Sequence, residues 1–323
     1  MRNLRSVRSA VTLLFAMILT QAAALAQECP GTQRLVVGLA TGGGMDALAR
    51  QLAQRVGVRF GRTIVVENRS GASGNIAAEF VARAHHDGCT LIIRGNEHNV
   101  NPLIYARAGY EPKDFVPVVR AISGPAVIFA ATNQPFKTLS GLVEFARANP
   151  GKLSYGSSGV GGANHVVTEM FLKSAQIDVT HVPYKGGGPA VTDAAAGHIA
   201  LVVTSYSSAE AFVIAGKLIP LAVTGPSRWK SLPDIPTVAE SGFPEATYSY
   251  WMGIFAPTGT PLAVREKLNE EFRAVLDEAP VRDRLLQQGF LTAGGSVSDF
   301  ESFLREDERI SRRLMQHLRL KVE

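Results

Sequence analysis

The chain has 323 residues, and at roughly 150 residues per domain this length predicts two domains. With 46% hydrophobic and 19% charged residues the composition is globular, which excludes intrinsic disorder, while 31 Gly and 17 Pro exclude a long coiled coil. The formal net charge is +5, but the first 26 residues hold three of the 33 basic residues and no acid, so the remainder is near neutral and does not predict a nucleic-acid-binding surface.

The first 26 residues have the pattern of a cleavable export signal. Arg2, Arg5 and Arg8 form a positive segment, residues 10–20 are apolar, and Ala24–Ala26 has the small-x-small form of a cleavage site. The apolar run is shorter than the about 20 residues that a membrane-spanning helix needs, which disfavours an uncleaved anchor. We expect cleavage near Ala26 and export to the periplasm of a Gram-negative cell.

The next segment alternates strands and helices. We expect strands at residues 34–38, 63–67 and 90–94, and helices at residues 45–56 and 75–84, the second capped by Asn75. Met45, Leu48, Ala49, Leu52 and Val56 share one face of the first helix. This order predicts a parallel, doubly wound sheet whose right-handed crossovers bring the turns after the strands to one edge.

A second series follows from residue 126. Expected strands lie at 127–131, 153–156, 179–182, 201–204 and 221–224, and expected helices at 139–148, 164–174, 188–197 and 207–216. The tail is helical from residues 261, 280 and 298, with capping boxes predicted at 207–210 and 298–301. We predict an α/β fold of two lobes, each a doubly wound, mostly parallel sheet flanked by helices. Residues 27–124 and 251–323 form the first lobe and 125–250 the second, with the ligand cleft between them.

Two glycine-rich loops, residues 40–45 and 156–164, each join a strand to a helix. Glycine permits close approach of a ligand, and the free N–H groups of a helix N-terminus attract an anion. We hypothesise that the N–H groups of Gly42, Gly43, Gly161 and Gly162 hold an anionic group; the alternative for each loop is a tight turn alone. Neither loop matches a phosphate-binding or dinucleotide-binding motif, so no nucleotide cofactor is expected.

Catalytic and metal-binding patterns are weak. The chain has no G-x-S-x-G or H-E-x-x-H motif, and its histidines lack ligand spacing, so we expect no metal. His98 and His165 follow strand ends and are expected to donate to a ligand, whereas His181, within a strand, is expected to be a core residue. An acid–base pair stays an open alternative.

Five segments together resemble a known family. They are Val-Glu-Asn-Arg at 66–69, Gly-Ala-Ser-Gly-Asn-Ile at 71–76, His-Val-Pro-Tyr-Lys-Gly at 181–186, Leu-Pro-Asp-Ile-Pro-Thr-Val at 232–238 and Ala-Pro-Thr-Gly-Thr-Pro at 256–261. From about Arg34 to its end the chain resembles the periplasmic substrate-binding proteins of tripartite tricarboxylate transporters, the Bug-type receptors.

The resemblance implies a two-lobe, Venus-flytrap receptor without enzymatic activity. Such a receptor captures a small organic carboxylate between two loops and presents it to an integral-membrane permease, and we expect it to be a monomer. The expected ligand-binding residues are Ala40, Thr41, Gly42, Gly43, Asn96, His98, Ser158, Gly159, Gly161, Gly162, Ala163, His165, Lys185 and Thr204. A secreted hydrolase or isomerase, or a receptor that feeds a signalling protein, are the alternatives.

Thr204 departs from the family pattern, in which many members carry Asp. A buried ammonium group without an acidic partner is costly. This replacement therefore predicts a ligand without an amino group.

The two cysteines are predicted to form a disulfide. Cys29 lies five residues before the first strand and Cys89 immediately before the third. In a sheet of order 2-1-3 these strands are parallel neighbours, so their amino ends lie side by side within disulfide reach, opposite the ligand edge. An exported compartment favours oxidation, and the alternative is two unrelated thiols.

Overall fold

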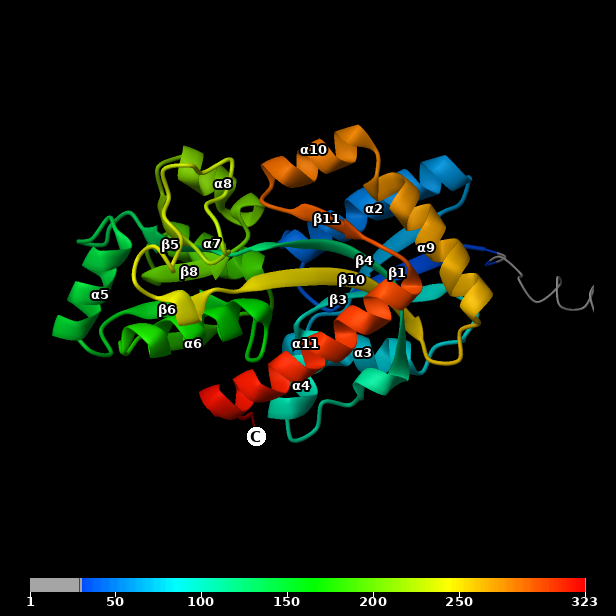
Figure 1. Ribbon diagram of the computed structural model, residues 1–323, viewed down its shortest axis with the longest axis horizontal. Helices are drawn as coiled ribbons and strands as arrows, with labels where there is room; N and C mark the ends of the chain where they lie inside the picture. Colours follow the sequence, from blue (N-terminus) through cyan, green and yellow to red (C-terminus); the bar gives the residue numbers. More distant parts are fainter. Residues whose placement is uncertain (1–28, 30, 323) are drawn as a thin grey trace, which may run out of the picture.

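The computed structural model describes Cys29 and residues 31–322, which form two β-sheets covered by helices (Figure 1). The predicted export signal lies outside these described residues. In this part of the chain, none of the helices combines the length and the apolar composition needed to cross a bilayer.

The first sheet has six strands in the order β11-β4-β10-β3-β1-β2. The strands are β1 (Gln33–Val37), β2 (Ile64–Asn68), β3 (Thr90–Gly95), β4 (Phe115–Pro125), β10 (Ser249–Pro257) and β11 (Leu291–Gly294). β1 pairs in parallel with both β2 and β3, which confirms the predicted 2-1-3 order. β10 is antiparallel to β3 and β4, and β11 is antiparallel to β4. We call this sheet and its helices the six-stranded half.

Helices cover both faces of this sheet (Figure 1). On one side are α2 (Gly44–Phe60), α9 (Leu262–Leu276) and α10 (Ala279–Gln287); on the other are α3 (Asn75–Ala82), α4 (Glu97–Ile104) and α11 (Val297–Leu318). The predicted apolar face of α2 is buried along its whole length, at 5% exposure or less. The burial of this face holds α2 against the sheet and so fixes the direction in which the helix N-terminus points.

The five-stranded half repeats this plan. Its sheet has the order β7-β6-β8-β5-β9, with β5 antiparallel to both neighbours. Its elements are β5 (Val127–Ala131), α5 (Leu139–Ala148), β6 (Ser154–Ser157), α6 (Ala163–Ala175), β7 (Thr180–Pro183), α7 (Gly187–Ala195), β8 (Leu201–Thr204), α8 (Tyr206–Ile214) and β9 (Leu218–Val223). β6 lies between β7 and β8 as β1 lies between β2 and β3, and the predicted α/β class is confirmed. Parallel pairing is confined to these two triplets, however, and the other strand pairs are antiparallel, so the sheets are mixed rather than mostly parallel as predicted.

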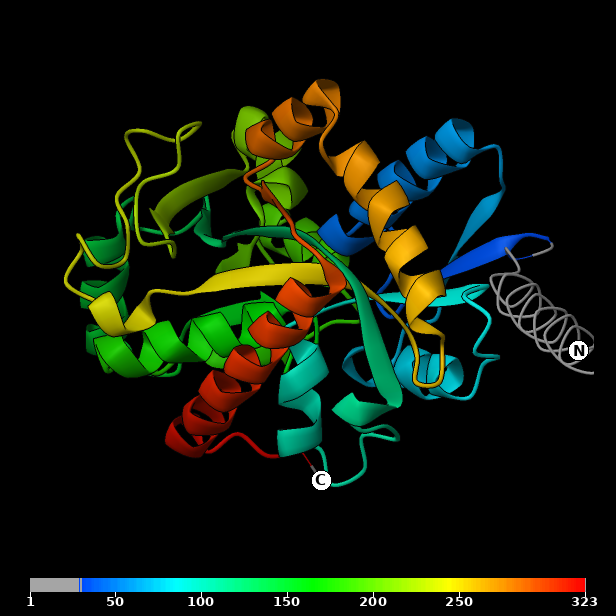
Figure 2. The same ribbon diagram turned by 45° about the vertical axis from the view of Figure 1, so that its right-hand side comes forward.

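The chain passes between the halves twice. β4 leads into β5 through Ala126, and the chain returns after β9 through η3 (Pro244–Ala246) into β10. β4 and β10 pair over nine residues of β10, and both run out of the six-stranded sheet toward the other half (Figure 2). Two further 3-10 helices, η1 (Ala72–Gly74) and η2 (Pro112–Asp114), lie in loops of the six-stranded half.

The sequence analysis missed four elements and misplaced three caps. It did not predict β4, β10, β11 or α4, because all three strands contain Gly or Pro and α4 contains Pro102, which local rules treat as breakers. The capping box of α11 is Ser296 with Asp299, two residues before the predicted one. α8 is capped at Ser205 rather than Ser207, and α3 at Gly74 rather than Asn75. Each of these three helices begins beside the end of a buried strand or beside a glycine whose backbone is in the left-handed conformation.

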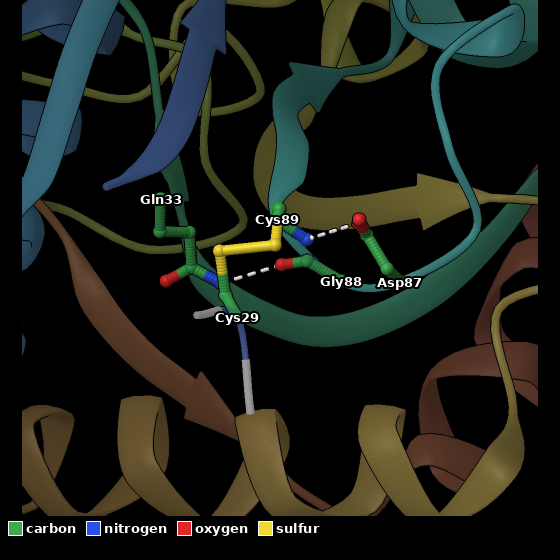
Figure 3. The surroundings of a disulfide bond; sticks show 5 residues. All are labelled: Cys29, Gln33, Asp87, Gly88 and Cys89. Atoms are coloured by element: carbon green, nitrogen blue, oxygen red, sulfur yellow. Dashed lines mark hydrogen bonds between the residues drawn. A yellow bond between two sulfur atoms is a disulfide. The ribbon is translucent and has the colours of Figure 1, made fainter. Parts of the chain in front are cut away.

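The predicted disulfide is confirmed. Cys29 and Cys89 are bonded, with their Cα atoms 5.1 Å apart (Figure 3). The Cys89 carbonyl accepts the N–H of Arg34 at 2.8 Å, the first contact of the β1–β3 pair. The bridge therefore joins the amino ends of two neighbouring parallel strands, at the edge opposite the glycine loops.

Candidate ligand-binding site

The first glycine loop connects β1 to α2 and faces the other half of the molecule. Gly43 caps α2 in an extended conformation, and no side chain hydrogen-bonds to the first N–H groups of that helix. A Cβ atom added to Gly43 would lie 3.8 Å from the backbone nitrogens of Gly187 and Gly188, and one on Gly44 only 3.1 Å from Ser205 Oγ. The contact at Gly43 is ordinary van der Waals contact, whereas a side chain at Gly44 would crowd Ser205, so the two halves approach each other closely at this point.

A backbone hydrogen bond joins the two halves beside this point of close approach. The N–H of Ala40 donates to the carbonyl of Lys185 at 2.9 Å. A Cβ on Gly186 would lie 3.1 Å from the same Ala40 nitrogen. The first loop therefore rests directly on the turn that precedes α7.

The second glycine loop connects β6 to α6 and is held by histidines. Ser157 Oγ lies 2.7 Å from His181 Nε2, and the N–H of Gly161 donates to His165 Nδ1 at 3.0 Å. Gly162 caps α6, again without a side-chain hydrogen bond to the helix start. The two loops thus occupy equivalent positions, each after the central strand of its parallel triplet.

Four helix N-termini meet at one cavity of about 60 Å³ between the halves. α2 contributes Gly43 and Gly44, α6 contributes residues 162–164, α7 contributes Gly187, and α8 contributes Ser205 and Ser208. At none of the four helix starts does the side chain of the cap residue accept a helix N–H group. Free N–H groups and four helix dipoles make this cavity a strong site for an anion.

Two acidic side chains also line the cavity, Asp46 and Glu97. The carboxylate of Asp46 is occupied by hydrogen bonds within the protein. Gly42 N–H, Arg50 Nε and Asn68 Nδ2 all donate to it at 3.0–3.1 Å. Burial alone would raise the pKa of Asp46, but these hydrogen bonds and the Arg50 charge outweigh it and hold the pKa below its usual value. Glu97 Oε1 accepts the N–H of Gly95 at 2.8 Å.

Residues 48–320 match the family model described as tripartite tricarboxylate transporter family receptor. The chain belongs to this receptor family. A relative encoded in the tcbD–tcbE intergenic region of Pseudomonas sp. strain P51 is 36% identical, over 87% of this chain and 85% of its own length. The BugT protein of Bordetella pertussis is 29% identical over 85% of each chain. The expected Bug-type resemblance is confirmed.

Solved structures support the same assignment. A Rhodopseudomonas palustris protein with adipate superposes with a TM-score of 0.87 at 34% identity, covering 91% of this chain and 99% of that one. MatC from Rhodopseudomonas palustris with bound malate gives a TM-score of 0.85 at 28% identity, covering 89% and 99%. The receptor therefore shares its fold with periplasmic binding proteins, and these neighbours are substrate-binding receptors.

The structure brings part of the predicted residue set to the cavity of this receptor. Gly43, Ser158, Gly162, Ala163 and Thr204 line it. Gly159 and Lys185, with Ser158, line an adjoining hollow of about 210 Å³. The two spaces share Leu39, Ser73 and Ser158 as lining residues, so they lie side by side.

The other predicted residues do not line either space. They are Ala40, Thr41, Gly42, Asn96, Gly161, His98 and His165. His98 is buried against Phe255, with ring centroids 4.5 Å apart, because α4 turns its first residues into the core beneath β10. Asn96 Oδ1 accepts the N–H of Trp251, a structural contact between β3 and β10. The backbone N–H of Gly161 is already paired with His165.

The two histidines that hold the second glycine loop, His165 and His181, are uncharged at neutral pH. Burial, with the neighbouring His181, lowers the pKa of His165 to about 3, and burial lowers that of His181 to about 4. The two rings stack with centroids 4.1 Å apart. His165 and His181 therefore shape the second loop through neutral hydrogen bonds rather than attracting the ligand by charge. No group of three His, Cys, Asp or Glu in the described residues could share a metal ion.

Several lining residues escaped the sequence analysis. Asp46, Ser73, Glu97, Ser205 and Ser208 lie one to four residues from predicted caps or strand ends, where a polar side chain gave no distinct signal. Tyr250, Trp251 and Met252 come from the unpredicted strand β10. The presence of two acids also removes the premise of the Thr204 argument, which assumed a cavity without a carboxylate.

Proposed function

We propose that this protein is a periplasmic receptor that captures a small organic carboxylate and delivers it to a tripartite tricarboxylate-type permease. The observation that carries the proposal is the convergence of four helix N-termini, none with a side-chain cap, on one cavity between two halves. A carboxylate satisfies several such N–H groups at once and is stabilised by the helix dipoles. Export, the permease partner and a monomeric state are proposed from family membership.

The relatives favour a carboxylate over other anions. Two solved structures with TM-scores of 0.85 or more contain adipate and malate. The cavity of this chain also lacks a positively charged lining residue within the described part, so backbone dipoles would supply the attraction. Such a site suits a compact carboxylate better than a multiply charged phosphate.

We further propose that the ligand closes two lobes, residues 27–124 with 251–323 and residues 125–250, over itself. Support comes from the cavity lining, which both halves contribute, and from the Ala40–Lys185 hydrogen bond beside it. A ligand that contacts both halves favours the closed arrangement by its extra contacts there. Small-angle scattering should show a smaller radius of gyration once a bound carboxylate has been identified.

Calorimetry on a panel of small carboxylates tests the binding proposal, guided by a mass spectrum of what copurifies with the protein. Gly187→Ala is the diagnostic variant, because its methyl group would lie 3.6 Å from Thr204 Oγ1 and 3.7 Å from Asn164 Nδ2, inside the cavity. We expect at least tenfold weaker binding. Gly31→Ala, an equally small addition with no atom within 4 Å of the new methyl group, is the control and should bind like the wild type. Equal affinity of the two variants would contradict the site.

Turnover separates the receptor from a hydrolase or isomerase. Incubation of each bound carboxylate with stoichiometric protein, followed by NMR, should return the compound unchanged. Product formation that is lost in Gly187→Ala would replace the receptor proposal with an enzymatic one.

A further inference from the structure

Glu97 is an acidic residue of the cavity with only part of its carboxylate in use. It is the first residue of α4, directly after β3, and it is 8% exposed. Its Oε1 accepts the N–H of Gly95, and among the described residues no hydrogen bond or ion pair engages Oε2. The side chain lines the cavity, so a group placed there is within its reach.

Asp46 makes the contrast clear. Both acids line the same space, but the Asp46 carboxylate accepts three hydrogen bonds from its own half and has an Arg50 partner. Its role is to hold the first glycine loop. Glu97 has one such bond, so it retains accepting capacity toward the cavity.

Removing a carboxylate oxygen from water costs free energy unless the oxygen gains a hydrogen-bond donor. A ligand that offers only methylene groups or a second carboxylate provides no donor, so this cost would remain. A hydroxyl or ammonium group on the ligand would remove it. Sites built around such a buried acceptor discriminate strongly against analogues that lack the donor.

We infer that Glu97 Oε2 accepts a hydrogen bond from the ligand, so that the cavity selects carboxylates bearing a hydroxyl or ammonium donor over their unsubstituted parents. This inference rests on the proposed function. The helix N-termini hold the carboxylate, and Glu97 accepts a hydrogen bond from the neighbouring substituent of the ligand. The shared chemistry is one hydrogen-bond donor near the bound carboxylate.

Two matched series test the selectivity by calorimetry on the wild-type protein. The four-carbon series is succinate, malate and aspartate, and the three-carbon series is propionate, lactate and alanine. In the series that fits the cavity, we expect the hydroxyl or the ammonium member to bind at least tenfold more tightly than the unsubstituted acid. Comparison of malate with aspartate, or of lactate with alanine, distinguishes the two donors.

Glu97→Gln tests the residue itself. The amide can still accept the Gly95 N–H through one oxygen, but it presents a donor where Oε2 stood. We expect at least tenfold weaker binding of the preferred acid and equal or tighter binding of its unsubstituted parent. Glu79→Gln, at a partly exposed position on α3, is the control and should keep wild-type selectivity. Melting temperatures of both variants report that the fold is retained.

The outcomes separate this inference from the proposed function. If an unsubstituted acid binds the wild type within threefold of its substituted partners, or if Glu97→Gln keeps wild-type selectivity, the inference is wrong while the carboxylate receptor stands. If no member of either series and no carboxylate of the wider panel binds, the proposed function fails and the inference fails with it. Should Glu97→Gln fail to fold, the wild-type selectivity alone decides.

Discussion

At the residue scale, burial decides what the ionisable side chains of this receptor can do. His165 and His181 lie beside the second loop with strongly lowered pKa values, and Arg94, 1% exposed, lies in the core of the six-stranded half. None of these side chains lines the cavity. Their influence on binding is therefore indirect, through the backbone that they hold.

The lowered pKa of His165 predicts acid sensitivity. The pKa of His165 is about 3 in the folded state, below the unfolded value of 6.5. The fold therefore favours the neutral imidazole, and the stability that this group contributes to the protein is lost as the pH falls below 6.5. The expected slope is about 1.4 kcal/mol per pH unit for this group. Denaturant unfolding at pH 7.5 and pH 5.0 should show a smaller loss in His165→Gln than in the wild type. The exposed His198→Gln is the control, and identical losses in all three proteins would refute the assignment.

Arg94 is a buried guanidinium with a single hydrogen-bonding partner among the described residues. Its Nη2 donates to the Tyr110 hydroxyl at 2.7 Å, and its Nε and Nη1 have none. We expect Tyr110→Phe to lower the free energy of unfolding by about 2 kcal/mol, because it leaves the buried Arg94 Nη2 without a hydrogen-bond acceptor. In an Arg94→Met background the same change should cost less than half as much. A double-mutant cycle measures this coupling, and additive effects would argue against it.

At the element scale, the amino ends of the parallel strands serve stability, and their carboxyl ends serve ligand binding. The disulfide lies at the amino ends of β1 and β3, while the glycine loop that follows β1 enters the cavity. This separation follows from right-handed crossovers, which place every turn after a strand at the same edge. Stability and binding can therefore be changed independently at the two edges.

Loss of the disulfide should lower stability without changing affinity. The bridge closes a loop with a sequence separation of 60, for which chain entropy predicts a contribution of about 4 kcal/mol. We expect the Cys29→Ser/Cys89→Ser protein, and the wild type in dithiothreitol, to unfold at lower denaturant concentration and to bind the carboxylate as before. Unfolding curves with and without reductant check the first point, and calorimetry the second. Coincident curves would show that the bridge adds nothing.

At the scale of the whole molecule, an apolar cluster and several polar contacts join the two halves. The cluster holds Val100 and Ile104 of α4 and Val166 of α6. Ser73 Oγ and Tyr105 Oη both donate to the carbonyl of Val160, at 2.6 and 2.9 Å. Ser73 and Tyr105 belong to the six-stranded half, and Val160 lies in the second glycine loop. These contacts join the two halves through the protein's own groups, so they contribute to the balance between the closed and open arrangements.

Tyr105→Phe should therefore shift the proposed closure toward the open form. Loss of one hydrogen bond of about 1 kcal/mol would weaken the apparent affinity about fivefold, because a smaller fraction is competent to bind. Tyr184→Phe is the matched control, since its hydroxyl bonds to Asp193 within the five-stranded half. Calorimetry gives the affinities, and scattering without ligand should show a larger radius of gyration only for Tyr105→Phe. Equal behaviour of the two variants would contradict the idea.

The sequence by itself determined the elements whose signals are local. The apolar face of α2 and the glycine turns after β1 and β6 can be recognised from a few neighbouring residues. The spacing of apolar residues along a helix and the backbone freedom of glycine are both local properties of the chain. The disulfide prediction assumed a doubly wound sheet of order 2-1-3, and the structure has this order and the Cys29–Cys89 bridge. The family was evident from short segments spread along the chain.

Only the tertiary structure decided what meets in the cavity. β10 pairs with β3 and β4 across more than 100 residues of chain, and this pairing brings Trp251 and Met252 to the ligand side. Glu97 and His98 are adjacent in sequence, yet one faces the cavity and the other the core, because successive residues of α4 point in different directions. Such placements depend on long-range packing, which no local pattern records.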